Sequence, residues 1–283
     1  MPQTIGNPGT WLASAFGLAG RHAADSAQAL GSEDTTPPRT RQLTNQDLRE
    51  ALYAGWHDFQ QCRTDVMFLV LLYPVIGIVL ALAALNMDLV PLIFPLIAGF
   101  ALLGPVSAVG VYEISRRREQ GEEIGWLGAL KVVESPRFAS ILVMGIYLAV
   151  IFCLWLVVAG HLYGATLGPE APASIGTFLG GLATGPGLVM IVLGCAIGGV
   201  FALAVLATSV VSFPLLLDRA VGLPVAVLTS IRVTRENPRV ILTWGAIVTL
   251  GLVLGSIPAL IGLVIVLPVL GHATWHLYRR AVA

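Results

Sequence analysis

The chain has 283 residues, of which 56% are hydrophobic and 11% are charged, and its mean hydropathy is +0.84. Soluble domains carry about 25% charged residues, so a water-soluble protein of this length could not bury this much apolar surface. The formal net charge is zero and no basic block with interleaved aromatic residues is present, which excludes the pattern typical of nucleic-acid binding. These properties predict an all-α integral membrane protein whose first partner is the lipid bilayer.

Residues 1–43 differ in composition from the rest of the chain. They are rich in Ser, Thr, Gly and Pro and include the stretch TTPPR at 35–39. A segment of this composition cannot form a packed core. We therefore expect a disordered cytoplasmic tail, followed by a membrane domain at residues 44–283.

The membrane domain contains six apolar runs that are long enough to cross a bilayer, whose hydrocarbon core of roughly 30 Å needs about 20 helical residues. They cover approximately residues 66–85, 90–112, 138–160, 187–215, 240–257 and 259–278. Short turns separate the first run from the second and the fifth from the sixth, so each of these pairs is predicted to form a hairpin. We expect a polytopic bundle of six transmembrane helices.

The lysines and arginines test this topology independently, because apolar residues alone define the runs. All 16 of them lie before the first run, between the second and third, between the fourth and fifth, or after the sixth. The opposite loops carry only Asp88, His161 and Glu170 as ionisable residues. The positive-inside rule then predicts a multi-pass protein with both termini in the cytoplasm.

The six runs are arranged as three similar units. A similar phrase opens the first, third and fifth runs: QCR at 61–63, SPR at 135–137 and NPR at 237–239. A short segment precedes each phrase, the second at about 122–134 and the third at about 222–235. The first begins with a capping box at Thr44 and Asp47, and its apolar face, which includes Gly55, lies opposite a polar face that includes Asp58. We expect three repeats, each an interfacial helix followed by a transmembrane hairpin.

The even-numbered runs also end alike. Aligning Pro105 with Pro268 places Glu113 over His276, and Asp218 closes the fourth run in the same way. Ionisable groups at this depth are costly unless they are paired. The nearest candidate partners are Arg63, Arg137 and Arg239. Two interpretations stay open: each group pairs separately at the membrane interface, or the three converge on a pseudo-threefold axis as a polar site or ion path.

Other motifs indicate packing more than chemistry. Gly194 and Gly198 form a G-x-x-x-G pattern, which we expect to allow close packing within the chain rather than dimerisation. His272 and His276 have metal-ligand spacing, but with five histidines in the chain and no cysteine beside them we predict no metal site. The three cysteines form no C-x-x-C pattern and are interpreted as small core residues. Nucleotide-binding loops, dinucleotide fingerprints and hydrolase motifs are absent, so we expect neither a cofactor nor catalysis.

Four stretches of the chain carry a family resemblance: AGFALLGP at 98–105, YEISRRRE at 112–119, SFPLLLDR at 212–219 and LPVLGHATWHLYRR at 267–280, of which the last is long and unusual. They resemble the bacterial membrane proteins of the domain-of-unknown-function family 2189, and the resemblance covers about residues 45–281. It implies an integral inner-membrane protein of a proteobacterium and transfers no catalytic residues. Some members carry a label as cytochrome c oxidase subunits. A haem-copper catalytic subunit needs several histidines within its membrane helices, whereas here only His272 and His276 qualify, both close to the interface.

Three classes of function follow from these observations. We expect a non-enzymatic scaffold or accessory subunit of a larger membrane complex, such as a respiratory one. The alternative is a transporter or channel for a small solute or lipid that uses a polar site on the cytoplasmic side. Transporter repeats commonly place their site at the membrane midplane, whereas these charges lie near one end. A membrane enzyme ranks third, because no polar constellation for lipid chemistry can be assembled from the sequence.

Overall fold

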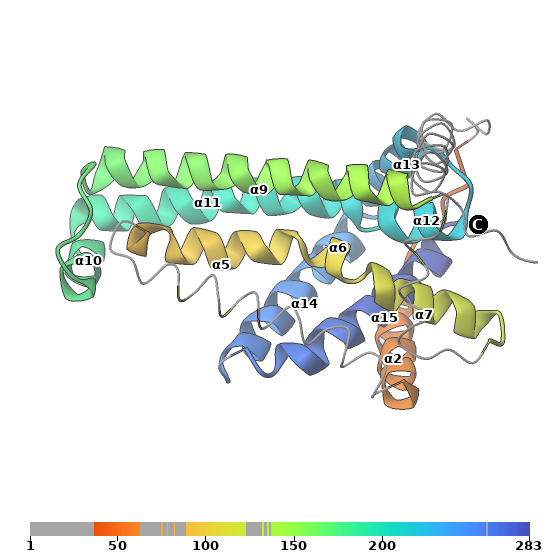
Figure 1. Ribbon diagram of the computed structural model, residues 1–283. Helices are drawn as coiled ribbons and strands as arrows, with labels where there is room; N and C mark the ends of the chain where they lie inside the picture. The colour runs from red at the N-terminus through yellow and green to blue at the C-terminus, as the bar shows by residue number, and fades with distance from the viewer. Residues whose placement is uncertain are drawn as a thin grey trace, which may run out of the picture.

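The computed structural model describes residues 37–62, 75, 78, 82, 89–122, 132, 135, 137–258 and 260–283. Two long helices, α9 (Phe138–Thr166) and α11 (Gly185–Ser209), lie side by side, and we call this pair the shaft (Figure 1). α10 (Ile175–Leu182) joins them at the far end of the shaft. The helix α5 (Ile93–Leu102), preceded by the 3-10 turn η1 (Val90–Leu92), runs along the shaft.

The remaining helices meet at the opposite end, which we call the base (Figure 1). The helices of the base are α2 (Asn45–Gln61), α7 (Val109–Glu119), α12 (Ser212–Asp218), α13 (Leu223–Glu236) and the C-terminal half of α15 (Leu263–Ala281). The short α6 (Gly104–Ser107) links α5 to α7. α14 (Pro238–Ser256) and α15 form a second hairpin that leaves the base at an angle to the shaft.

Helix starts follow local signals in the sequence. Thr44 accepts a hydrogen bond from the backbone N–H of Asp47, and the Asp47 carboxylate accepts one from the backbone of Thr44, which confirms the predicted capping box of α2. Ser174 caps α10 and Thr184 caps α11 in the same manner. These caps satisfy backbone donors that a helix leaves unpaired at its N-terminus.

Three helical stretches are long and apolar enough to cross a membrane: Phe138–Thr166, Gly185–Asp218 and Pro238–Ser256. They correspond to the third, fourth and fifth predicted runs, and the first of them extends past the predicted end at residue 160. The described residues therefore support an integral membrane protein that is all-helical in its named elements. The count of six transmembrane helices stays a prediction.

The other predicted runs differ from continuous spans. The second is divided into α5, α6 and α7, and Pro105 in the first turn of α6 accounts for the break between α5 and α6, because proline has no N–H to continue the hydrogen bonds of α5. The sixth starts at Leu263 rather than at residue 259, after a turn in which Leu260 adopts a left-handed backbone with φ of 67°. The first, at 66–85, lies outside the described residues except for helical positions 75, 78 and 82.

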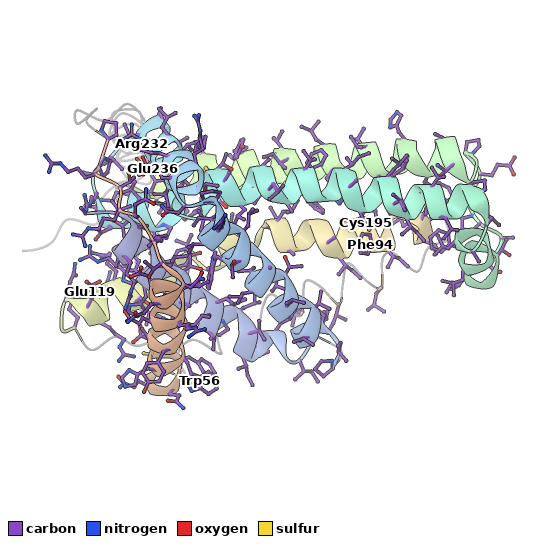
Figure 2. All side chains as sticks on the ribbon, turned by 180° about the vertical axis from the view of Figure 1, so that it is seen from behind. Trp56, Phe94, Glu119, Cys195, Arg232 and Glu236 are labelled. Atoms are coloured by element: carbon purple, nitrogen blue, oxygen red, sulfur yellow. The ribbon has the colours of Figure 1, made fainter. Side chains whose placement is uncertain are left out.

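The hydrophobic core is concentrated in the base. Trp275, Tyr278 and Phe213 are among its largest side chains and are completely or almost completely buried. On the shaft, by contrast, Leu142 is 51% exposed and Val192 is 66% exposed. Lipid tails can cover such side chains at no cost in water exposure, which explains an apolar outer surface on helices that cross a bilayer. Charged side chains gather at the base (Figure 2).

The segment before α2 is paired with the C-terminus. The backbone N–H of Arg41 donates to the carbonyl of Ala281, and that of Ala283 donates to the carbonyl of Arg39, both at 2.9 Å. Leu43 adds a hydrogen bond from its backbone N–H to the side chain of Asn237 at 2.6 Å. Residues 39–43 fall within the range assigned to a disordered tail, whose residues 1–36 lie outside the described ones. Local amino-acid composition cannot predict such backbone pairing, because it joins segments near opposite ends of the chain.

The predicted interfacial helices are represented by α2 and α13, whereas the second, at 122–134, lies almost wholly outside the described residues. α2 packs mainly on α15, so the helix that opens the first unit contacts the helix that closes the last. α13 packs on α11 and α12. The three-repeat arrangement stays a prediction.

Candidate functional site

The three residues predicted to be equivalent are carried by helices that pack against one another at the base. Glu113 lies on α7, Asp218 closes α12, and His276 lies near the end of α15. The ends of these three helices therefore lie together at the base. In the described part of the chain, however, the three side chains bind different partners and do not form one shared site.

Glu113 is held by two arginines of its own helix. Its side chain is only 3% exposed, and it accepts hydrogen bonds from Nε and Nη2 of Arg116, both at 2.7 Å, and from Nε of Arg117. Residues three and four positions apart lie on the same helix face, which explains this arrangement. The hydrogen bond with Glu113 raises the pKa of the Arg116 guanidinium, although partial burial acts in the opposite direction. Arg116 therefore stays positively charged.

A cleft of about 250 Å³ opens beside this pair, and we call it the arginine cleft. Its lining residues come from α7, α12 and the segment before α9: Glu113, Arg116, Arg117, Val132, Ser135, Arg137 and Leu217. Nη1 of Arg137 donates to the carbonyl oxygens of Leu217 at 2.5 Å and of Asp218 at 3.2 Å. These are final carbonyls of α12, so the guanidinium caps a helix C-terminus, where a positive charge is favourable.

The arginines predicted as partners of the acids are therefore placed differently. The guanidinium of Arg137 binds the backbone carbonyl of Asp218 and not the Asp218 carboxylate. Arg239 is exposed at the start of α14, and no described acid forms an ion pair with it. Arg63 lies outside the described residues. Among the described residues, Glu113 pairs instead with Arg116 and Arg117 of its own helix, and the Asp218 carboxylate pairs with Arg279 of α15. Pairing with Arg63 stays a prediction.

Asp218 instead links α12 to α15. Its Oδ2 accepts a hydrogen bond from the Tyr278 hydroxyl at 2.6 Å and one from Nη1 of Arg279 at 3.3 Å. Arg279 also donates to Glu119 of α7 at 3.0 Å, and Trp275 donates its Nε1–H to the same carboxylate at 3.1 Å. One face of α15 thus ties the ends of α7 and α12 together.

His276 binds an acid of α2 that the sequence placed on a solvent-exposed face. Its Nε2 lies 2.8 Å from Oδ2 of Asp58, whose other carboxylate oxygen is 3.8 Å from Nη1 of Arg118. The same nitrogen of Arg118 donates to Sγ of Cys62 at 3.1 Å. Asp58 turns toward α15 because Gly55, one turn earlier on α2, lets the two helices approach. A Cβ at Gly55 would lie 2.5 Å from the backbone nitrogen of Ala273.

His272 lies completely buried beside this pair. Its Nδ1 is 2.6 Å from Oγ of Ser115 and 3.9 Å from Oδ2 of Asp58, whereas its Nε2 has no hydrogen-bond partner among the described atoms. A serine nucleophile triad requires serine and aspartate on opposite ring nitrogens, so this geometry does not match one. Within the described ranges, no group of three or more His, Cys, Asp or Glu side chains is placed to hold a metal ion.

Sequence reasoning missed Asp58, Ser115 and Arg118 as partners of the histidines. The available signal was Gly55: a glycine within an otherwise apolar helix face indicates that another backbone passes closely. That signal points to close packing but does not identify α15 as the neighbour.

The Asp58 contacts predict a pH dependence of stability. Burial raises the pKa of the Asp58 carboxyl, but the hydrogen bond with His276 and the nearby positive groups outweigh it and hold the pKa below its ordinary value. Those groups are His276, His272 and Arg118. Because the pKa is lower in the folded than in the unfolded chain, the stabilisation is complete above the ordinary carboxyl pKa of about 3.9 and is lost as the pH falls through the lower folded value.

Asp58→Asn is accordingly expected to lower the free energy of unfolding by about 2 kcal/mol near neutral pH, the typical value of a hydrogen bond to a charged group. Its deficit relative to the wild type should shrink below about pH 4. Thermal unfolding of both detergent-solubilised proteins, near pH 7 and near pH 3.5, measures this. A deficit of the same size at both pH values would contradict an ionised Asp58 as the cause.

The G-x-x-x-G motif of α11 faces α9. A Cβ at Gly198 would lie 3.0 Å from the ring of Trp155, and one at Gly194 would lie 3.6 Å from Leu162. Both glycines therefore support close packing within the chain. The interpretation of all three cysteines as core residues is wrong: Cys62 is buried, whereas Cys153 and Cys195 are exposed on the shaft, where Figure 2 labels Cys195.

Comparisons with known proteins bear on the segment that holds the arginine cleft. Comparison with curated proteins and with solved structures found no match. Residues 93–218 match a family model described as "Predicted integral membrane protein (DUF2189)", and this range runs from α5 to the end of α12. The resemblance inferred from the sequence is therefore confirmed over residues 93–218, where the chain carries the pattern of this family of integral membrane proteins.

Proposed function

We propose that the protein is a non-enzymatic scaffold or accessory subunit of a membrane complex in the bacterial inner membrane. In this proposal the chain crosses the membrane six times in three repeated units, and both termini lie in the cytoplasm. The one-sided distribution of its 16 lysines and arginines supports that orientation. The backbone hydrogen bonds from Ala283 to Arg39 and from Arg41 to Ala281 also support it, because they hold the segment before α2 and the C-terminus at the same end.

The observation that carries the proposal is the surface of α11. In the stretch Gly185–Asp218, which comprises α11 and α12, only 6% of the most apolar part is buried within the protein, against 22% for the corresponding parts of α9 and α14. Gly194 and Gly198 face inward, while Cys195 and Gly199, also four residues apart, are exposed on the outer side. A Cβ at Gly199 would meet no atom within 4 Å. Small residues at this spacing allow another membrane helix to approach closely.

A pull-down from native membranes tests this interface. The affinity tag belongs at the N-terminus, because the C-terminal Val282 is 3% exposed and Ala283 is hydrogen-bonded. We expect the wild type to retain a stoichiometric protein partner in gentle detergent, and Gly199→Leu to retain it at a level reduced about tenfold or more, since a bulky side chain blocks close helix packing. Gly180→Leu is the matched control, because Gly180 is exposed on α10, away from the proposed interface.

Gly199→Leu and Gly180→Leu should give the same gel-filtration profile, because both positions are open: a Cβ at Gly199 or at Gly180 would meet no atom of a neighbouring segment within 4 Å. If the wild type retains no stoichiometric partner, the scaffold proposal fails. If Gly199→Leu and Gly180→Leu retain the partner equally well, α11 is not the contact surface. Mass spectrometry of the retained proteins would identify whether the complex is respiratory.

The arginine cleft favours a second candidate function, transport of a small solute or lipid through a site on the cytoplasmic side. Its charged side chains include Glu113 and Arg137, both predicted from the sequence as members of a polar site. Reconstituted vesicles that release no more solute or lipid label than protein-free vesicles would exclude this candidate. Such a result would leave the scaffold proposal intact.

A further inference from the structure

The arginine cleft carries more positive than negative charge. The guanidinium groups of Arg116, Arg117 and Arg137 line it together with the single carboxylate of Glu113. Glu113 pairs with Arg116 and Arg117, whereas the guanidinium of Arg137 has only carbonyl oxygens as hydrogen-bond partners among the described residues. Two further carboxylates, those of Asp218 and Glu122, act on Arg116 but do not line the cleft. The Asp218 carboxylate is engaged by Tyr278 and Arg279 of α15. The excess of two positive charges at the lining favours an anion.

Hydrogen-bond donors are available for this anion. Within the described part of the chain, Nη1 of Arg116 and both Nη atoms of Arg117 make no hydrogen bond, and Arg137 uses only Nη1. The Ser135 hydroxyl accepts from the backbone N–H of Arg137 at 3.2 Å, which leaves its own proton to donate. Planar guanidinium groups bind phosphate oxygens through paired N–H donors. The donor set, which comes from three guanidinium groups and a hydroxyl, therefore suits an anion with several acceptor oxygens, such as a phosphate group.

The size and walls of the cleft narrow the ligand further. Its volume of about 250 Å³ is below the roughly 300 Å³ at which pockets for drug-sized molecules begin, so only a small charged group fits inside. Val132 and Leu217 add apolar wall next to the arginines. A phosphate group that is attached to an apolar molecule, such as a lipid, matches such a lining.

In the proposed topology, the cleft lies at the depth where lipid phosphates are found. Glu113 follows the end of the second apolar run at residue 112, and Arg137 precedes the first residue of α9. These are the points at which the helices leave the hydrocarbon region in the proposed topology. Basic pockets between membrane helices on the cytoplasmic side bind anionic headgroups.

The geometry points to a binding site in the arginine cleft for the phosphate group of an anionic lipid headgroup. This assignment rests on the membrane topology proposed above but not on the presence of a protein partner, so the two can fail separately. Glu113 holds the heads of Arg116 and Arg117 in place and also offsets part of their charge. Removing its charge should therefore strengthen binding, while removing arginine charge should weaken it.

Ligand-dependent thermal unfolding of the full-length protein in a neutral detergent tests the site. The probes are short-chain phosphatidylglycerol, phosphatidylcholine with the same chains, and inorganic phosphate. Phosphatidylglycerol should raise the unfolding temperature of the wild type and phosphatidylcholine should not. The double variant R117Q/R137Q should bind phosphatidylglycerol about tenfold or more weakly, since each guanidinium supplies charge-assisted hydrogen bonds. R232Q/R235Q is the matched control, because it removes the same charge from exposed positions on α13 outside the cleft; Figure 2 labels Arg232.

Glu113→Gln gives a check of opposite sign and is expected to bind phosphatidylglycerol several-fold more tightly, roughly the effect of one partly screened charge. It keeps the test decisive if R117Q/R137Q fails to fold by gel filtration. If inorganic phosphate binds as tightly as phosphatidylglycerol, the cleft is a phosphate site whose ligand is free phosphate and not a lipid headgroup. The proposal is overturned if neither phosphatidylglycerol nor inorganic phosphate raises the unfolding temperature of the wild type. It is also overturned if R232Q/R235Q loses as much affinity for phosphatidylglycerol as R117Q/R137Q, or if Glu113→Gln binds phosphatidylglycerol more weakly than the wild type.

Discussion

Gly55→Ala is expected to separate α2 from α15 and to lower the free energy of unfolding by about 3 kcal/mol, the upper end of the usual cost of overpacking. The new Cβ would lie 2.5 Å from the backbone nitrogen of Ala273 and 2.7 Å from its Cα. Backbone atoms of a packed helix cannot rotate away as a flexible side chain can. The helices must therefore move apart, which also stretches the contact between Asp58 and His276.

Two measurements check this expectation. Thermal unfolding in detergent gives the loss of stability, and labelling of Cys62 by a water-soluble maleimide reports whether α2 lifts, with Cys153 and Cys195 replaced by serine in every protein compared. Cys62 is buried in the wild type and should label faster in Gly55→Ala. Gly199→Ala is the matched control and should be neutral or slightly stabilising, because the site is open and alanine favours a helix. Equal stability and labelling for Gly55→Ala and the control would disprove the close approach.

Glu113→Ala is expected to cost about 3 kcal/mol of stability, because it leaves charges near the protein interior without their partner. The side chains of Arg116 and Arg117 are only 20% and 18% exposed and would repel each other once the carboxylate is removed. Equilibrium unfolding of the purified protein measures the loss. A second variant that also replaces Arg117 by methionine should recover part of it, since an apolar side chain tolerates burial without a partner.

Glu119→Ala is the control for this prediction. Glu119 lies on the same helix and pairs with Arg279, but its side chain is 43% exposed, so solvent screens the pair. We expect it to cost about 1 kcal/mol or less. Similar losses of stability for Glu113→Ala and Glu119→Ala would show that burial does not make the ion pairs of Glu113 with Arg116 and Arg117 more stabilising than an exposed pair.

The chemistry of the site was only partly predictable. Glu113, Asp218 and His276 were identified because three helices end alike, and the structure does place those helix ends together. Their partners were not identified, since pairing in space depends on which helices are neighbours. Asp58 shows the difference: periodicity placed it on the polar face of α2, and only the docking of α2 on α15 turned it into the partner of His276.

The sequence by itself determined that the protein is a helical integral membrane protein, and it located the three apolar stretches that the structure shows as long helices. These properties follow from composition and from the free energy of moving each residue into lipid, which are additive along the chain and need no knowledge of neighbours. The tertiary structure alone decided that α2 docks on the last helix, that the segment before α2 pairs with the C-terminus, and that Arg116, Arg117 and Arg137 surround one cleft. Such contacts join residues far apart in the chain, and packing selects them only when whole helices meet.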